Sequence, residues 1–342
     1  MIKSTSLLIL ALVSFISGSC KRQPDPSPHH GLLWKITGNN LTEPSYLFGT
    51  YHGPGALAIL DSIQGFDSVF TSSKIFVCEF LWSYDQFVAT NKKDSPEDKL
   101  LKPWPVQDST YENLLTEKQK NLLDSVILSD KLLQYAKQAN FRPSLLMNAI
   151  QFSYIKASQR NQEKHTSIKD SGRNTILDVY LQNRAKDCQM DITALESKDQ
   201  VQKITDSVYS HLPQVSYRLE AGLLMWYIEN LAILDSLKND LSEKKLSAYL
   251  RQNLDLILKT SYGVFKKEVY TGSDISFFQE LERYLAARDR LIYDARNNFW
   301  MKLIPDLIRE NSCFIAVGAG HLPGETGLIN QLQQLGYTVV PN

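Results

Sequence analysis

Two of the six histidines lie in matching motifs towards opposite ends of the chain. Gly49–Gly55 and Gly318–Gly324 both read G-x-x-H-x-P-G, which places His52 and His321 at equivalent positions. Each motif follows an apolar run and precedes a helical pattern, so each predicts a strand, a tight turn and a helix. Glycine permits the sharp turn, and proline suits the first turn of a helix. Both histidines are therefore expected at strand ends, where open α/β sheets place their ligand crevices.

A glutamate marks the end of another predicted strand. The run Lys74–Phe80 carries Glu79 near its carboxyl end. Burying an unpaired carboxylate is costly, so Glu79 either points to water from an edge strand or has a function. Two histidines and a glutamate are the ligand set of many hydrolytic metal sites. A divalent metal ion held by His52, Glu79 and His321 would activate water for hydrolysis.

A second acidic position follows a further predicted strand. Met190–Leu195 reads as a strand, and Glu196 and Gln200 come directly after it, four residues apart. That spacing places the two side chains on one face of a helix that starts there. They either support the site, with Glu196 taking a proton from water, or form a solvated helix start, where glutamate is favoured by the helix dipole.

An arginine and an asparagine complete the set of candidate site residues. Arg296 and Asn297 stand one helical turn before Trp300 and just ahead of the second histidine motif. Such a pair near a carboxylate and two histidines can orient a ligand or hold an oxyanion. The alternative is an ordinary surface arginine in a salt bridge. The histidines have an alternative too, since each can simply cap a helix or fill a turn, but two matching copies favour a function.

Several segments follow the pattern of one known family: Leu33-Trp34, Tyr46–His52, Arg296–Trp300, Phe314–Gly324, Gly327-Leu328 and Gly336–Val339. Through them the chain resembles the TraB/GumN family, which is related to the Tiki proteases. The resemblance covers about residues 31–342, weakly through the middle. It implies functional roles for Glu79 and for the pair Arg296 and Asn297, favours a supporting role for Glu196 and Gln200, and extends less firmly to Asp178. Tiki-like relatives imply a metal-dependent peptidase.

The expected fold is α/β (α+β), with a central mixed sheet built from both chain ends and a large helical middle region. Gly31–Thr37 and Ser45–Thr50 flank a turn and predict a hairpin. A short helix is expected between Leu57 and Phe66. Neither end has enough strands for a stable sheet alone, so the pieces 45–80 and 313–340 are expected to share one.

The helical middle region is expected as a cap or insert. Apolar stripes at helical spacing, interrupted by few glycines and prolines, continue through most of residues 108–310. We therefore expect one domain at 31–342, with a helical cap or insert at about 108–290.

The first thirty residues read as a targeting segment and a tether. Residues 1–19 form a signal peptide, with Lys3 before an apolar core too short to be a comfortable membrane span. Small residues directly before Cys20 resemble a bacterial lipobox, so acylated Cys20 is expected to anchor the protein to a membrane in the cell envelope, outside the cytoplasm. An ordinary secretory signal with a chance cysteine is the alternative. Residues 20–30 are polar and proline-rich and predict an extended tether.

Composition excludes several classes of protein. The chain has 37 basic and 37 acidic residues, so no basic field argues for a nucleic-acid partner. Beyond Cys20 only three cysteines remain, too few for a disulfide scaffold. Neither H-E-x-x-H nor G-x-S-x-G occurs, so the common zinc-protease helix and the serine-esterase elbow are both absent.

Three functions fit these residues. The first is a metal-dependent, peptidase-like hydrolase acting on a peptide or small-molecule substrate. The second uses one histidine as a general base and Arg296 as the anion holder without metal, as in the distantly related erythromycin-esterase-like enzymes. The third is a non-catalytic lipoprotein that binds haem or a peptide signal. For the enzymes we expect both histidines at a crevice rim, where replacement removes turnover and leaves the fold intact.

Overall fold

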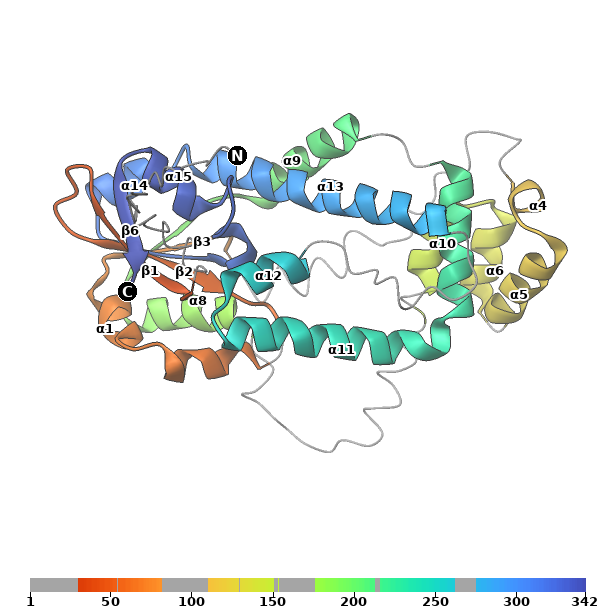
Figure 1. Cartoon of the computed structure of the whole chain (residues 1–342), viewed down its shortest axis with the longest axis horizontal. Coiled ribbons are helices and arrows are strands. Elements are labelled where there is room, and N and C mark those ends of the chain that lie inside the picture. The colour runs from red at the N-terminus through yellow and green to blue at the C-terminus, as the bar shows by residue number, and fades with distance from the viewer. Residues whose placement is uncertain are drawn as a thin grey trace, which may run out of the picture.

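The computed structural model describes residues 30–53, 55–81, 110–128, 130–150, 153, 176–212, 216–261 and 275–342. Within these residues the strands are β1 (Leu33–Gly38), β2 (Ser45–Thr50), β3 (Ile75–Cys78), β4 (Asp191–Ala194), β5 (Cys313–Gly318) and β6 (Tyr337–Pro341). They form one mixed sheet in the order β4-β3-β5-β2-β1-β6 (Figure 1). β4, β3, β5 and β2 run parallel, and β1 is antiparallel to β2 and β6. The predicted α/β fold, with a sheet built from both chain ends, is confirmed.

The register between β2 and β5 sets the two histidine turns side by side. Gly49 pairs with Val317, and Thr50 pairs with Gly318. The glycines that begin the two motifs therefore do not pair, and the motifs are offset by one residue. Because side chains alternate between faces along a strand, this offset makes the two turns structurally inequivalent. A Cβ on Gly49 would lie 2.9 Å from the Cβ of Ala319, so glycine is required where the turns touch.

An aromatic cluster fills the core on one face of the sheet. Phe314 of β5 contacts Phe48, Phe66, Phe70 and Phe76 with ring centroids 4.9–6.4 Å apart. All five rings are buried, and such pairs add to the free energy gained from burying their area. Shorter helices surround the sheet: η1 (Ala56–Ser62), α1 (Phe66–Ser72), α8 (Leu177–Asp187), α12 (Leu254–Ser261), α14 (Ile304–Glu310), η3 (Ala319–His321) and α15 (Leu328–Gln334).

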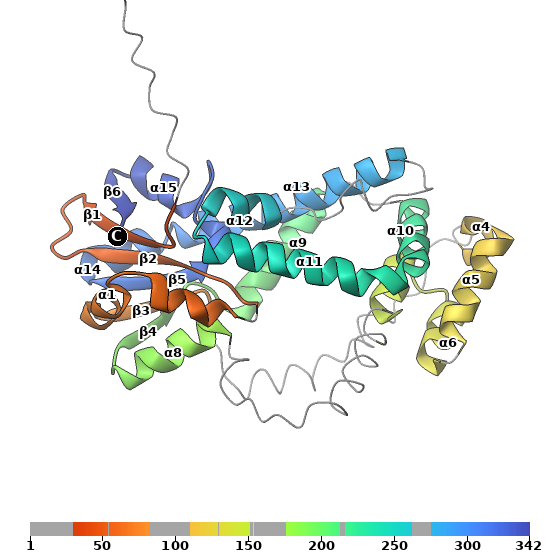
Figure 2. The same cartoon turned by 60° about the horizontal axis from the view of Figure 1, so that its bottom comes forward.

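A second hydrophobic cluster lies away from the sheet and forms the predicted helical region. It includes residues of α4 (Tyr111–Leu114), α5 (Glu117–Ile127), α6 (Lys131–Gln138) and α10 (Tyr217–Glu229). Two long helices, α11 (Leu231–Leu250) and α13 (Ile275–Trp300), run between this cluster and the sheet (Figures 1 and 2). α9 (Lys198–His211) packs along α13. The long helices therefore join the two cores, and their sheet-proximal ends carry side chains to the strand ends.

The helix expected between Leu57 and Phe66 differs from the prediction. The segment forms a short 3-10 helix, and a separate α-helix begins at Phe66. Gly55 and Gly65 precede these two helices with φ angles of 82° and 74°. Because a left-handed glycine breaks a helix, Gly65 separates the 3-10 helix from α1. The strand prediction at Lys74–Phe80 is confirmed with closer bounds, so that Glu79 directly follows β3.

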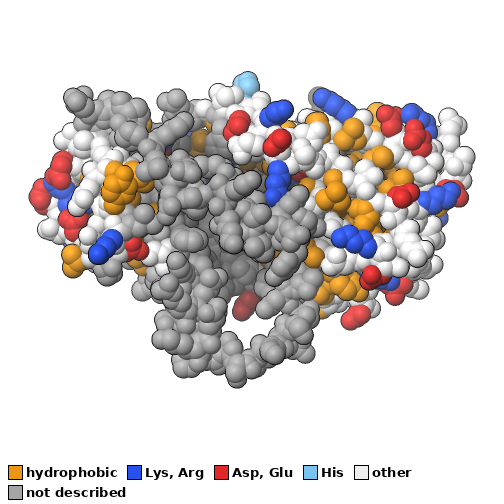
Figure 3. All heavy atoms as spheres, turned by 180° about the vertical axis from the view of Figure 1, so that it is seen from behind, with side chains coloured by type: hydrophobic (Ala, Val, Ile, Leu, Met, Phe, Trp, Pro, Cys, Tyr) orange, Lys and Arg blue, Asp and Glu red, His pale blue; other side chains and the backbone are white. Residues whose placement is uncertain are grey.

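The predicted signal peptide, Cys20 and the tether up to residue 29 lie outside the described residues, as does Pro54 of the first motif. Among the helices that the structure does describe, none combines the length and apolar character needed to cross a membrane. Basic and acidic side chains are interspersed on the face seen in Figure 3, as expected for a chain with balanced charge.

Candidate functional site

The site lies at the carboxyl ends of the four parallel strands. β2 leads to Thr50 and His52, β5 leads to Gly318 and His321, and Glu79 and Glu196 follow β3 and β4. The backbone N–H of Glu196 donates to the carbonyl of Glu79 at 2.9 Å, which extends the strand pairing by one step. The two glutamates are therefore neighbours. This is the sheet edge at which α/β folds bind ligands.

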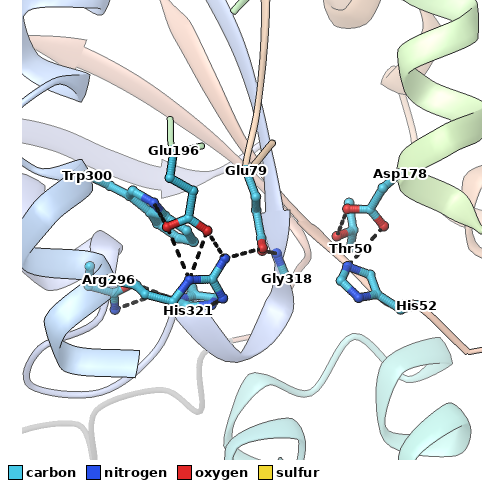
Figure 4. Close-up of polar contacts among 10 residues, drawn as sticks. Thr50, His52, Glu79, Asp178, Glu196, Arg296, Trp300, Gly318 and His321 are labelled. Atoms are coloured by element: carbon cyan, nitrogen blue, oxygen red, sulfur yellow. Dashed lines mark hydrogen bonds and ion pairs between the residues drawn. The ribbon is translucent and has the colours of Figure 1, made fainter. Parts of the chain in front are cut away.

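Arg296 connects the two glutamates. Its Nη2 donates to Oε2 of Glu79 at 2.6 Å, and its Nε donates to Oε1 of Glu196 at 3.0 Å (Figure 4). One turn later on α13, Trp300 Nε1 donates to Oε2 of Glu196 at 3.0 Å. The Arg296 guanidinium also lies over the Trp300 ring, 4.7 Å from its centroid. One cation thus serves two carboxylates, and the cluster keeps a net negative charge.

Glu79 is ionised in this environment. Burial opposes its charge, but Arg296 and the Gly318 N–H, which donates to Oε1 at 2.6 Å, outweigh that cost and lower the pKa of Glu79 to about 2. A similar balance holds for Arg296. Burial disfavours its positive charge, but the carboxylates of Glu79 and Glu196 outweigh that cost and raise the pKa of Arg296. Glu79 therefore acts as a fixed anion near neutral pH, with no proton to donate.

His321 has one tautomer that fits its hydrogen bonds. Asn297 Nδ2 donates to the carbonyls of His321 and Thr326 at 3.2 and 2.9 Å, which leaves Asn297 Oδ1 as an acceptor. Because that oxygen lies 2.7 Å from Nδ1 of His321, Nδ1 carries the proton. Nε2 is then an acceptor, and Nη1 of Arg296 lies 3.2 Å from it. The ring is neutral and its lone pair faces the guanidinium.

The burial of His321 corrects the expectation that both histidines sit at a crevice rim. His321 is only 3% exposed, and the rings of Tyr293 and Trp300 each lie 4.4 Å from its own, centroid to centroid. Burial lowers its pKa to about 3, with Glu79 opposing the shift. The one-residue offset between the motifs directs this histidine inward. Its replacement is therefore expected to affect the fold as well as any activity.

His52 has a different environment. Its Nε2 lies 3.3 Å from Oδ2 of Asp178, whose side chain is 6% exposed, while the His52 side chain is 47% exposed. Thr50 Oγ1 donates to the other oxygen of Asp178 at 2.9 Å and fixes the carboxylate. The hydrogen bond to Asp178 raises the pKa of His52 above its ordinary value, although burial partly opposes this. A histidine backed by a buried carboxylate is a typical general base.

Both histidines line one cavity of about 340 Å³. Glu79 and Arg296 line it too, and Figure 4 shows Glu79 between the His52–Asp178 pair and the Arg296–His321 group. The remaining walls come from β2, α11, α12, α13 and the second histidine turn: Thr50, Tyr51, Lys245, Tyr249, Ile257, Thr260, Tyr293, Gly318, Ala319 and Gly320. A cavity of this volume accepts a small ligand or the end of a longer one.

The sequence profile of the TraB/PrgY/gumN family matches residues 32–341. The chain belongs to this family. Because the match spans nearly the whole chain, the family resemblance carried by the two histidine motifs is confirmed. Comparison with curated proteins gave no match, and comparison with solved structures gave none either.

Three predicted site residues of this TraB/PrgY/gumN protein do not line the cavity. Glu196 lies behind Arg296 with its side chain fully buried, and Asn297 lies behind His321. Gln200 is elsewhere: its Oε1 accepts the backbone N–H of Ser197 at 2.6 Å in a capping box that begins α9. The prediction that Glu196 and Gln200 share a helix face is wrong, because α9 starts at Lys198, after Glu196. The S-x-x-Q spacing of the capping box is readable in the sequence.

The family resemblance extended only weakly to Asp178, the partner of His52, and Asp178 was not among the candidate site residues. The signal for it was its position in the apolar run Ile176–Leu181, where a buried acid needs a partner. Thr50, Lys245 and Tyr249 carried no comparable signal. Tyr249 donates from its hydroxyl to the carbonyl of Gly49 at 3.0 Å, which fixes α11 to β2 beside the cavity.

The predicted metal ligands do not form a ready metal site as they stand. Among the described residues, no three His, Cys, Asp or Glu side chains are grouped so as to hold an ion. The donor atoms of this family member are also engaged, because Arg296 contacts both Nε2 of His321 and a carboxylate oxygen of Glu79. A divalent ion held by His52, Glu79 and His321 would require Arg296 to move away. The metal site stays a prediction, and no chemical step below depends on it.

Proposed function

We propose that this protein is a peptidase-like hydrolase that cleaves a peptide, or a related small acyl substrate, in the cavity between the two histidine turns. Membership of the TraB/PrgY/gumN family and the α/β fold agree with such a role but do not specify it. The observation that carries the proposal is the shared cavity. His52, backed by Asp178, and Arg296 border the same space, so one carbonyl group can meet both.

In the proposed reaction His52 is the general base. Its Nε2 proton is held by Asp178, so Nδ1 takes a proton from water as the water oxygen attacks the substrate carbonyl carbon. The charged ring is stabilised by the carboxylate behind it. The same proton is then donated to the leaving nitrogen or oxygen as its bond to carbon breaks. Atoms and charges balance with water as the only co-reactant.

Arg296 stabilises the negative charge that develops on the carbonyl oxygen. Its Nε and Nη2 are committed to Glu196 and Glu79, which hold the guanidinium rigidly in place. Its Nη1 contact with neutral His321 is longer, at 3.2 Å, and can be exchanged for the substrate oxygen. A fixed donor of this kind costs little reorganisation during the reaction. Glu79, Glu196, His321 and Asn297 are then positioning residues for Arg296.

The proposal extends to location. The short apolar core and the small residues before Cys20 support a lipid anchor, and the polar residues 21–30 would separate the domain from the membrane. The substrate would then be met on the non-cytoplasmic side of the cell envelope.

The test is turnover of a panel of peptides and esters by the purified full chain in detergent. His52→Ala and Asp178→Asn should lose most turnover, whereas His211→Ala, an exposed histidine on α9, should retain it. If the parent cleaves nothing on the panel but binds haem or a peptide stoichiometrically, the chain is a binding lipoprotein and the proposed hydrolase is wrong.

A further inference from the structure

A lysine lines the cavity without a partner to neutralise it. Lys245 of α11 faces the same space as His52 and Glu79, and no ion pair or hydrogen bond to it occurs among the described residues. The other lining cation, Arg296, is already shared by two carboxylates. Among the described residues lining the cavity, Lys245 is therefore a cation with no carboxylate in direct contact.

The position of Lys245 is fixed by the helix that carries it. Tyr249 comes one turn later on α11, so the two side chains share a helix face. The buried Tyr249 hydroxyl donates to the carbonyl of Gly49 at 3.0 Å. This bond holds the carboxyl-terminal end of α11, which carries Lys245, against Gly49 of β2, three residues before His52. The backbone of Lys245 and the proposed catalytic residues thus keep a fixed relationship across the cavity.

An acidic residue on a neighbouring helix acts on Lys245 without neutralising it. Asp289 of α13 exerts a favourable electrostatic effect on the lysine, but its carboxylate accepts from Nε of Arg288 at 2.8 Å. Burial therefore dominates and lowers the pKa of Lys245 below its ordinary value. An anionic ligand group beside the ammonium would restore the missing partner, because opposite charges in a partly desolvated site attract strongly.

We propose that Lys245 binds a free carboxylate of the substrate, so that the site takes a small peptide or N-acyl amino acid with its terminal carboxylate unblocked. A single ammonium without a direct ion pair matches a monoanion. A phosphate dianion would meet the same one cation in a cavity that the carboxylate of Glu79 also lines, and that carboxylate would repel its second charge. The cavity of about 340 Å³, with Ile257 and Tyr249 among its walls, suits a compact ligand with an apolar side chain.

The inference names the substrate class for the proposed hydrolase and therefore rests on that proposal. Its test measures binding without turnover. Hydrocinnamate carries a phenyl ring and a free carboxylate, hydrocinnamyl alcohol is its neutral counterpart, and neither contains a hydrolysable bond. Calorimetric titration into the full chain should show hydrocinnamate binding roughly ten- to a hundredfold more tightly than the alcohol, as expected for one charge-assisted hydrogen bond.

Four variants make the test specific. Lys245→Met preserves length and apolar stem and should abolish the preference for the carboxylate, whereas Lys245→Arg should keep part of it. Lys259→Met, at an exposed position on α12, is the matched control and should behave as the parent. His52→Ala should lose turnover yet keep the carboxylate preference, which separates this inference from the proposed mechanism. An unchanged preference in Lys245→Met, or tighter binding of inorganic phosphate at the same site, would overturn the assignment.

Turnover supplies a second readout if a cleaved peptide is found. Lys245→Met should raise KM for peptides with a free terminal carboxylate and leave kcat nearly unchanged, because the lost contact is present in both the bound and the transition state. For the same peptides with an amidated terminus, KM should already be high in the parent and should not change further. Equal KM values for both peptide forms in the parent would contradict the inference.

Discussion

Nη1 of Arg296 lies 3.2 Å from Nε2 of His321. The amide of Asn297 fixes the proton on the other ring nitrogen, so the lone pair of Nε2 faces a guanidinium. A cation is thus already present where a metal ion held by His321 would bind. In the proposed hydrolysis, a metal held by His321 would have to displace this contact.

Chelation is the direct test of that contact. Because the proposed steps use only His52, Asp178 and Arg296, dialysis of the purified chain against a chelator should leave kcat/KM unchanged. Elemental analysis should find less than one equivalent of transition metal per chain. Loss of turnover on dialysis, restored by one divalent ion and not by others, would reinstate the metal site at His52, Glu79 and His321.

The two histidines should respond differently to replacement by alanine. His52→Ala should lose turnover and, at alkaline pH where the charged pair with Asp178 no longer contributes, melt as the parent does, because its side chain is half exposed. His321→Ala should lose turnover and also roughly 2–3 kcal/mol of stability, since it removes a buried ring and leaves Asn297 Oδ1 without its donor. Thermal melting and turnover of both variants check this. Equal melting temperatures for the two would show that His321 is not a packing residue.

Turnover should follow the titration of His52. The general base must be neutral, and Asp178 raises its pKa above the ordinary value of about 6.5. Hence kcat/KM should rise with pH through that raised pKa. Asp178→Asn should move the midpoint to lower pH and reduce the plateau, while Asp187→Asn, exposed on the same helix, should leave the profile unchanged. A midpoint that does not move in Asp178→Asn would exclude His52 as the titrating group.

The same pair makes a linked prediction for stability. Because the pKa of His52 is raised on folding, the charged pair stabilises the fold fully below about pH 6.5, and this contribution is lost as pH rises through the raised pKa. The difference in melting temperature between the parent and Asp178→Asn should therefore shrink from acid to alkaline pH.

Removal of the arginine should be costly and pH-dependent. Arg296→Met leaves Glu79 and Glu196 buried without their cation, which should cost roughly 3–5 kcal/mol near neutral pH. The folded-state pKa of Glu79 is lowered to about 2, so its contribution is present above the unfolded value and lost as pH falls towards that pKa. Denaturant unfolding should show the gap to the parent closing in acid. Arg290→Met, largely exposed on the same helix, is the control and should change little.

The anchor prediction is independent of the fold. When the chain is expressed with its own signal, the parent should partition into detergent, and Cys20→Ser should remove both the acyl mass and the partitioning. Cys188→Ser, an exposed thiol within the domain, should leave both unchanged. Identical partitioning of parent and Cys20→Ser would identify the segment as an ordinary secretory signal.

The strands and the polar residues at their ends were predictable from the sequence because local patterns specify them. Apolar runs ended by glycine turns placed His52 and His321 at strand ends, and a lone acid in an apolar run marked Glu79. Parallel strands then bring such ends to one edge of the sheet, as β2, β3 and β5 do here. The prediction for Gln200 was wrong because a partner closer in the sequence competed. Its spacing from Glu196 suggested a place in the site, but its side chain binds the backbone of Ser197, three residues away.

Only the tertiary structure decided what each side chain does there. The two motifs share one pattern in the sequence, yet they are offset by one residue between β2 and β5, and His321 is buried while His52 is half exposed. The partner of His52 is held by Thr50, from which Asp178 is separated by 128 positions in the chain. Protonation, charge pairing and access to the cavity depend on desolvation and on neighbours brought together by folding. Local sequence patterns contain the residue types but not these long-range distances, so they identified the candidate residues without assigning their roles.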